Sequence, residues 1–151
     1  MKVIFRKYKK EDCARFEEMV KLFAREESDW DIPVEHIKKT LKEFSKFPEK
    51  GTIYIFVLDQ KIVGYAALVN YWNMYAGGNY LAVDEIFVDA AWRGRGIATA
   101  FIEYLQKSVS RTFVAISLEV GRKNKKAKKL YQKLGFQKEG YEFMISKLKR
   151  D

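Results

Sequence analysis

The sequence predicts one α+β domain in which helices flank a mixed sheet, and three observations support this fold class. The chain has 151 residues, which is the usual size of a single domain. Stretches rich in β-branched and aromatic residues alternate with stretches whose apolar residues recur at helical spacing. The sequence has no repeats, low-complexity segments or linkers. We therefore expect residues 1–151 to form one domain.

The first half of the chain predicts a strand, two helices and a hairpin. Apolar residues predict a first strand that ends near Tyr8, and a helix is expected to begin at residues 10–12. The apolar face of this helix consists of Phe16, Met19, Val20, Phe23 and Ala24. Pro33 suits the first turn of a second helix because its φ is already helical. The elements that follow are strand 52–58, turn 59–61 and strand 62–71.

The second half of the chain alternates strands and helices. A loop at residues 73–79 leads into strand 80–88, whose last residues are β-branched or aromatic. Apolar residues at helical spacing then predict a helix that ends near Ser108. The remaining predicted elements are strand 113–120, helix 124–134 and a strand 141–148 that closes the sheet.

Residues 84–99 carry the strongest functional signal, because they predict a strand, a glycine-bearing turn and the start of a helix. Gly94 and Gly96 allow the backbone to approach a ligand closely. The first amides of the helix have no partners inside it, and the helix dipole favours an anion at this end. A phosphate or pyrophosphate is therefore the expected ligand of the turn. Arg93 and Arg95 add positive charge to it.

Two nucleotide-binding motifs fit this turn poorly. A P-loop needs a Gly-Lys-Ser/Thr ending, which the sequence lacks. A dinucleotide fingerprint is partly matched by Gly94, Gly96 and the later Glu119. However, Thr99 occupies the third glycine position, and the preceding strands are expected to be antiparallel.

Composition excludes several other functional classes. No apolar run approaches the roughly 18–20 residues that a membrane span needs, and no signal peptide precedes the first strand, so we expect a cytoplasmic protein. Cys13 is the only cysteine and His36 the only histidine. One residue of each kind makes neither a disulfide, a structural zinc site nor a histidine-based hydrolase relay, so no metal is expected.

The net charge of +9 leaves three interpretations open. Eight basic residues and no acidic residue lie between positions 122 and 138: Arg122, Lys123, Lys125, Lys126, Lys128, Lys129, Lys133 and Lys138. They form either a solvated helix face, a site for the phosphates of a cofactor, or a nucleic-acid surface. The last is the weakest, because no base-stacking aromatic residues alternate with the lysines, and we expect no nucleic-acid partner.

Two spaced motifs point to one family. The first is Arg-x-x-Gly-x-Ala, formed by Arg93, Gly96 and Ala98. The second consists of Asn124, Ala127, Leu130, Tyr131, Gly135 and Phe136. Together they resemble the GNAT superfamily of acetyl-coenzyme A-dependent N-acetyltransferases, nearest in layout to the small-amine and polyamine enzymes. The motifs cover residues 79–148, and the first half matches by layout. The resemblance implies a mostly antiparallel sheet whose central parallel strands splay apart.

The resemblance also implies acetyl-coenzyme A as cofactor. We expect the amides of the glycine turn to hold its pyrophosphate and the edge of strand 80–88 to pair with its pantetheine arm. The expected cofactor-binding residues are Ile86, Phe87, Val88, Arg93, Gly94, Arg95, Gly96, Ile97, Ala98, Thr99 and Asn124.

Three residues are candidates for proton transfer. The resemblance implies that Tyr131 protonates the leaving thiolate, and its phenol is protonated at neutral pH. Otherwise Tyr131 simply packs beside its apolar helix neighbours. Asp84 and Glu85 are adjacent on a strand, so alternation predicts that only one faces the cleft. Related enzymes favour Asp84 as the base, while Glu85, a water molecule or a plain ion pair with lysine stay open.

The resemblance places the acceptor beside two aromatic and acidic segments. These contain Glu26, Glu27, Asp29, Trp30 and Asp31 in one loop, and Trp72, Tyr75 and Tyr80 around another. Carboxylates beside aromatic rings suit a cationic amine, although the acidic loop equally suits a solvated helix cap. We therefore expect an N-acetyltransferase for the primary amine of a small, cationic acceptor. Protein N-termini or lysines, a nonenzymatic acyl-coenzyme A sensor and a homodimer stay open.

Overall fold

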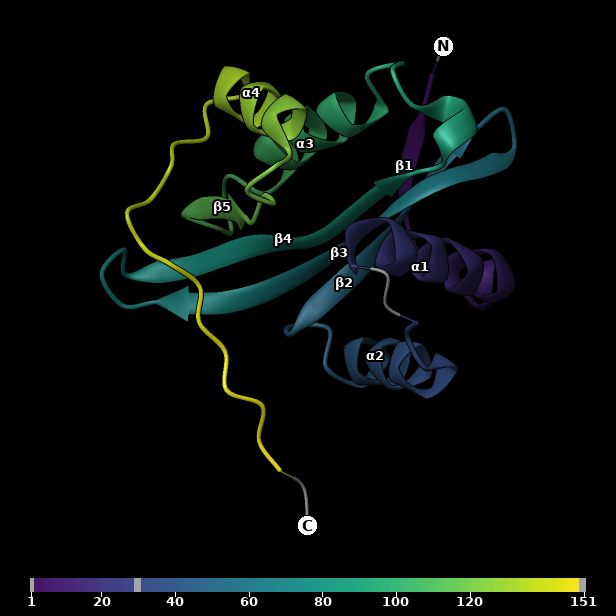
Figure 1. Cartoon of the computed structure of the whole chain (residues 1–151), viewed down its shortest axis with the longest axis horizontal. Coiled ribbons are helices and arrows are strands. Elements are labelled where there is room, and N and C mark those ends of the chain that lie inside the picture. The colour runs from purple at the N-terminus through teal and green to yellow at the C-terminus, as the bar shows by residue number, and fades with distance from the viewer. Residues whose placement is uncertain (1, 29–30, 150–151) are drawn as a thin grey trace. The chain divides into compact units, whose positions relative to one another are not determined.

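The computed structural model describes residues 2–28 and 31–149, which fall into two compact units (Figure 1). Unit 1 is Met1–Glu119 and unit 2 is Val120–Asp151. Unit 1 contains the sheet and most of the helices, and unit 2 contains a single described helix, α4 (Lys125–Lys133). That residues 1–151 form one domain stays a prediction.

Unit 1 follows the predicted order of elements closely. Its strands and helices are β1 (Ile4–Lys7), η1 (Lys10–Asp12), α1 (Cys13–Ser28), α2 (Val34–Lys46), β2 (Gly51–Leu58), β3 (Lys61–Asn73), β4 (Gly78–Val88), η2 (Ala90–Trp92), α3 (Ile97–Ser108) and β5 (Ala115–Leu118). The hairpin turn at Asp59 and Gln60 adopts positive φ values at both residues, as a tight two-residue turn requires. The expected elements up to β5 are therefore present, with bounds shifted by a few residues.

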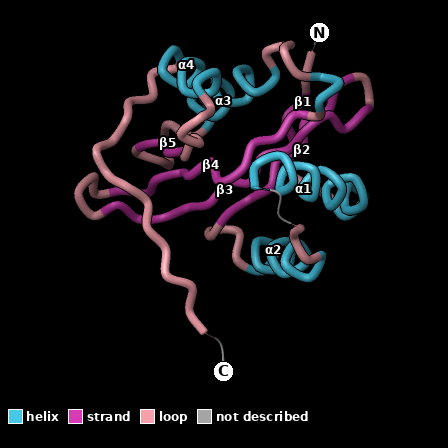
Figure 2. The backbone as a smooth tube through the Cα atoms, viewed as in Figure 1, coloured by secondary structure: helices cyan, strands magenta, loops and turns pink. Residues whose placement is uncertain are grey.

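The five strands form one mixed sheet in the order β1-β2-β3-β4-β5 (Figure 2). The first three pairings are antiparallel, and β4 pairs with β5 in parallel. The parallel pairing runs from Tyr80–Ala115 to Val83–Leu118, but β4 continues to Val88. The last part of β4 therefore extends beyond its pairing with β5, which agrees with the expected separation of the central strands.

Helices cover the two faces of the sheet with different side chains. On one face, Phe16, Met19 and Val20 of α1 and Ile37 of α2 pack into one buried cluster with Tyr65 and other sheet residues. On the other face, Phe101 of α3 packs against Phe56 and Phe5, with ring centroids 4.6 and 5.2 Å apart. Because Phe101 is fully buried, α3 is fixed to the sheet by its own apolar face.

Arg6 and Asp12 fix the start of α1 to β1. The two nitrogens of the Arg6 guanidinium donate to the two Asp12 carboxylate oxygens at 2.7 and 2.8 Å. The main-chain N–H of Lys9 donates to the same carboxylate at 2.8 Å. Asp12 is only 4% exposed, and the hydrogen bond from Arg6 holds its pKa below the ordinary value.

We expect Asp12→Asn to lower the free energy of unfolding by about 2–4 kcal/mol at neutral pH, because Arg6 would lose its charged partner. A lowered carboxyl pKa stabilises the fold above the unfolded-state pKa, and this contribution disappears as the pH falls through the folded-state pKa. Urea unfolding at pH 7 and near pH 3 should therefore give a difference between wild type and variant that shrinks in acid.

Glu18→Gln is the control, because the Arg15–Glu18 pair is more exposed. Its loss should change stability by less than about 0.5 kcal/mol. A similar loss of stability in both variants would contradict the assigned role of Asp12.

The predicted closing strand is wrong. Residues 141–148 form no strand, and their apolar side chains are exposed: Tyr141, Phe143, Met144, Ile145 and Leu148. In Figure 1 this part of the chain runs as an extended trace without an arrow. An alternating apolar pattern predicts a strand only where a neighbouring strand accepts its main-chain hydrogen bonds, and the described sheet ends at β5.

Candidate functional site

Strand β4 contains a bulge at the point where its pairing with β5 ends. The pairing with β3 passes from Leu68–Val83 to Ala67–Glu85, so Asp84 is an extra residue without a partner. Such a bulge bends a strand and redirects its side chains. The parallel pairing with β5 also ends at Val83. The bulge thus separates the paired part of β4 from the part that leads to the glycine turn.

The bulge brings both carboxylates to the same face of the sheet. Glu85 accepts a 2.7 Å hydrogen bond from the hydroxyl of Tyr65, which belongs to the core beneath α1 and α2. Asp84 faces α2 and lines a cavity with residues of that helix. The prediction that alternation directs only one of the two carboxylates to this face is therefore wrong, because the extra residue interrupts the two-residue period.

The environment of Glu85 favours its neutral form. Burial raises the pKa of Glu85, and the negative charge of Asp84 raises it further, against the opposing effect of the Tyr65 hydrogen bond. The pKa of Tyr65 is also raised, first by burial and then by the charge of Glu85. Glu85 is therefore a more basic carboxylate than an exposed one, as proton abstraction from an amine requires.

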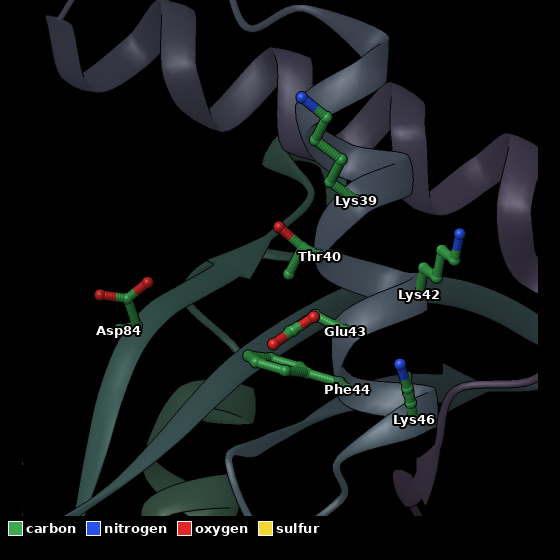
Figure 3. A pocket seen from close by; sticks show the side chains of 7 residues that line it. All are labelled: Lys39, Thr40, Lys42, Glu43, Phe44, Lys46 and Asp84. Atoms are coloured by element: carbon green, nitrogen blue, oxygen red, sulfur yellow. The ribbon is translucent and has the colours of Figure 1, made fainter. Parts of the chain in front are cut away.

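A cavity of about 620 Å³ lies between α2 and β4 (Figure 3). It is lined by Lys39, Thr40, Lys42, Glu43, Phe44, Lys46 and Asp84. In Figure 3, Glu43 and Phe44 project from α2 towards Asp84, whereas the ammonium groups of Lys42 and Lys46 point away from it. Glu43 pairs with Lys50 at 2.5 Å. The cavity thus offers acidic and aromatic groups next to the bulge.

The glycine turn, residues 93–96, leads directly into α3. Gly94 and Gly96 both adopt φ +75°, and Gly96 is the N-cap residue of α3. A Cβ atom at either position would meet no atom within 4 Å. No described side chain caps the helix, whose first printed main-chain bond runs from the Ala100 N–H to the Gly96 carbonyl. The turn therefore combines open space with uncapped amides, and it fits a diphosphate.

Side chains around the turn differ in what they can offer a ligand. Ile97 and Phe87 are each 3% exposed, so only their main-chain groups are available. Ala98 and Thr99 are half-buried in the first turn of α3. The guanidinium of Arg95 lies 4.7 Å from the centre of the Trp92 ring. Arg95 thus keeps an exposed positive charge beside the turn.

Arg93 is held by groups of the protein itself. Its Nη2 donates to both carboxylate oxygens of Glu26, at 2.6 and 2.9 Å, and its Nε donates to the Val88 carbonyl at 2.7 Å. The guanidinium also lies 5.4 Å from the centre of the Phe87 ring. Both Glu26 and Arg93 were expected to contact a ligand, and the structure places them on each other.

The main-chain groups of Ile86 and Val88 face the open edge of β4. The Asp89 N–H donates to the Val63 carbonyl of β3 at 2.9 Å, so every second residue of β4 bonds to β3. Ile86 and Val88 lie between these residues and point their N–H and C=O groups away from β3. The bond from Arg93 to the Val88 carbonyl agrees with this direction. Such an edge can pair with an extended amide chain.

Unit 2 contains the second group of expected site residues. Asn124 caps α4, because its side-chain oxygen accepts a 3.1 Å hydrogen bond from the Ala127 N–H. Tyr131 is 9% exposed, and its ring lies 5.7 Å from that of Phe136. Burial raises the pKa of Tyr131, so its phenol stays protonated over a wide pH range. Most of the basic residues from 122 to 138 are exposed, as on a solvated face.

The expected acceptor residues lie on separate elements. Glu26 and Glu27 are on the last turn of α1, while Asp29 and Trp30 lie outside the described residues. Trp72 and Tyr75 are 64% and 96% exposed, near the closed end of the β3–β4 hairpin. Nearby, Tyr80 packs on Tyr71, with ring centroids 5.4 Å apart. The structure does not bring the hairpin residues to the bulge of β4.

Sequence reasoning missed the α2 side of the cavity and the partners of the turn. Thr40, Glu43 and Phe44 gave no signal, because a polar helix face looks like ordinary surface. The Arg93–Glu26 pair joins residues 67 positions apart, and no local pattern shows such a pair. Within residues 2–28 and 31–149, no group of three or more His, Cys, Asp or Glu residues could hold a metal ion. In the same residues no helix is long and apolar enough to cross a membrane.

Comparison with known proteins identifies relatives of the whole arrangement. The model of the acetyltransferase (GNAT) family matches residues 16–136. A streptothricin acetyltransferase of Escherichia coli is 35% identical over 89 residues, which cover 58% of this chain and 48% of that protein. The chain spans about half the length of the curated relatives it matches.

Solved structures share the fold at lower identity. A crystal structure described as a "possible acetyltransferase" from Clostridium difficile 630 has a TM-score of 0.85 at 19% identity, covering 98% of this chain and 99% of that one. An aminoglycoside acetyltransferase from an uncultured soil metagenomic sample, in complex with sisomicin, has a TM-score of 0.76 at 19% identity, with 97% of each chain covered. The predicted α+β GNAT fold is thereby confirmed.

Proposed function

Because the chain belongs to the acetyltransferase (GNAT) family, we propose that it moves an acetyl group from acetyl-coenzyme A directly to the primary amine of a small, cationic acceptor. The observation that carries this proposal is the sequence of features along β4. An acidic bulge at Asp84 and Glu85 is followed by an open strand edge and then by uncapped amides at the glycine turn. One strand therefore carries the groups for proton transfer and for binding the donor.

The proposed donor site is built from main-chain groups. Acetyl-coenzyme A supplies a thioester whose carbonyl carbon the amine attacks. The N–H groups of Ile97, Ala98 and Thr99 would hold its pyrophosphate, with Arg95 beside them. The open edge at Ile86 and Val88 would pair with the amides of its pantetheine arm. A main-chain N–H of this edge would also polarise the thioester carbonyl.

The proposed base is Glu85. An amine must lose a proton to attack, and a carboxylate of raised pKa accepts it more readily than an ordinary one. Asp84 is exposed on the same face, so its charge attracts a cationic amine and supports the raised pKa of Glu85. The proton passes from the amine to Glu85 directly or through one water molecule.

The proposed acid is Tyr131, which would return a proton to the thiolate as it leaves. Its phenol is buried and has a raised pKa, so it carries a proton at neutral pH. We propose that Asn124 contributes to binding the pantetheine arm, as its motif position suggests.

A small acceptor is supported by the names of two similar proteins. These are a streptothricin acetyltransferase and an aminoglycoside acetyltransferase solved with sisomicin. The acidic and aromatic lining of the cavity beside Asp84 suits a cation. We also propose that the acceptor contacts Glu27, Asp29 and Trp30 after α1. The hairpin residues Trp72, Tyr75 and Tyr80 stay acceptor candidates without a neighbouring site residue in unit 1.

A thiol-release assay with a panel of amines, combined with isothermal titration of coenzyme A, tests the function. We expect coenzyme A to bind and acetyl-coenzyme A to release thiol when polyamines or amino sugars are present. Binding without turnover on every amine would favour the nonenzymatic sensor, and turnover only with peptides would favour a protein acceptor. A protein that does not bind coenzyme A would overturn the proposed function.

Gly96→Ala is expected to weaken coenzyme A binding by roughly tenfold or more, because its Cβ would enter the space assigned to the pyrophosphate. The positive φ should also cost about 1 kcal/mol of stability. Gly77→Ala is the matched control, since Gly77 has φ +62° and equally open surroundings in the β3–β4 turn. Titration of coenzyme A into both variants separates the two effects, and equal affinities would contradict the phosphate site.

A further inference from the structure

The end of α1 is joined to the glycine turn by the Glu26–Arg93 ion pair. Arg93 is fixed on two sides, by the Glu26 carboxylate at 2.6 and 2.9 Å and by the Val88 carbonyl at 2.7 Å. Glu26 and Arg93 are each a little under half exposed, so solvent screens the pair only in part. Two parallel interactions with one carboxylate restrict the guanidinium in orientation as well as position.

A second ion pair joins the same face of α1 to the other end of this segment. Arg15 pairs with Asp89, the residue that follows β4 and caps η2 by accepting from the Ala91 N–H at 3.3 Å. Arg15 and Glu26 are 11 positions apart on α1 (26 − 15), which is about three helical turns. They therefore lie within about 20° of each other around the helix axis. One stripe of α1 thus holds both ends of residues 89–93.

The Glu26–Arg93 pair also determines what Arg93 can do. A guanidinium that is paired with a carboxylate carries little net charge towards a phosphate, and its Nε is used by Val88. The positive groups left for an anion are the main-chain amides of the turn and Arg95. Arg93 therefore acts as a link between the end of β4 and the end of α1.

We propose that Glu26 is a positioning residue for the donor site, which acts through Arg93 and does not touch the acceptor. Glu26 fixes Arg93, Arg93 fixes the Val88 carbonyl and the start of the glycine turn, and the amides after Gly96 are thereby held ready for the diphosphate. This inference rests on the proposed function. It differs from the expectation that the acidic residues at the end of α1 all bind the amine.

The test is isothermal titration of coenzyme A into the whole chain, without acceptor. We expect Glu26→Gln to weaken binding by about three- to tenfold, the loss typical of one charge-assisted, partly exposed pair. Glu18→Gln is the matched control, because it removes a 2.7 Å ion pair with Arg15 from the same helix and leaves both links in place. Its affinity should equal that of the wild type. The acceptor KM of Glu26→Gln should also be unchanged.

A double-variant comparison shows whether Glu26 acts through Arg93. In an Arg93→Gln background, Glu26→Gln should cause no further loss of affinity, since its partner is already absent. Full additivity, unchanged affinity of Glu26→Gln, or a change confined to the acceptor KM would each overturn the inference. Wild-type protein that binds no coenzyme A would overturn the proposed function and this inference together, whereas normal wild-type binding with equal binding by Glu26→Gln overturns only the inference.

Discussion

Glu85→Gln is expected to lower kcat/KM by roughly 10²–10⁴-fold, because the amide cannot accept a proton from the amine. Gln retains an oxygen that can accept the hydrogen bond from the Tyr65 hydroxyl, so the buried contact is preserved. Coenzyme A affinity should be close to that of the wild type, which would show that the loss lies in the chemical step. The measurement is initial-rate kinetics with the best amine of the panel.

The pH profile gives a second, independent readout for Glu85. Its raised pKa means that the carboxyl is still protonated at pH values where an ordinary glutamate is ionised. A base must be ionised, so wild-type kcat/KM should rise with pH through this raised value, above the ordinary pKa of 4.5. Glu85→Gln should lose this rise.

Asp84→Asn separates the two carboxylates. If Glu85 is the base, Asp84→Asn should shift the rise in kcat/KM to lower pH, because it removes a negative charge that raises the pKa of Glu85. Near-normal turnover in Glu85→Gln, combined with a large loss in Asp84→Asn, would transfer the role of base to Asp84.

Tyr131→Phe is expected to lower kcat by roughly 10²–10⁴-fold, because the thiolate would leave without a proton donor. The ring stays, so its contact with Phe136 and the end of α4 should be maintained. The raised pKa of the phenol predicts that wild-type activity holds on the alkaline side beyond the usual titration of a tyrosine near pH 10. Rates measured with saturating acetyl-coenzyme A test the prediction.

Tyr141→Phe is the control for that variant, since Tyr141 is 90% exposed in the same unit. It should leave kcat unchanged. Near-normal turnover of Tyr131→Phe would show that a solvent molecule or another group protonates the thiolate.

Much of the fold could be predicted because it depends on local patterns. The expected strand 80–88 is β4 (Gly78–Val88), and the helix expected to end near Ser108 is α3 (Ile97–Ser108). The strand expected at 113–120 is shorter, as β5 (Ala115–Leu118). Periodicity fixes the type of an element well, but its ends depend on which neighbours complete the hydrogen bonds.

The site could be predicted only where its chemistry resides in consecutive residues. The turn with Gly94 and Gly96 is visible in the sequence, because glycine spacing reports backbone conformation. The bulge at Asp84 is not visible, since the strand carries no glycine or proline there and the extra residue exists only relative to β3. The Glu26–Arg93 pair is likewise a product of tertiary structure. The closing strand at residues 141–148 failed for the same reason, since its pattern contains no partner.

The burial of Phe101 between Phe5 and Phe56 has a consequence for ligand affinity. Phe101 lies one helical turn after Ile97, so aromatic packing fixes the axis of α3 close to its anion-facing end. The amides there are oriented when the protein folds, and a ligand loses little of its interaction energy to ordering the chain. Donor recognition thus draws on a rigidity stored in aromatic rings that the donor itself never meets.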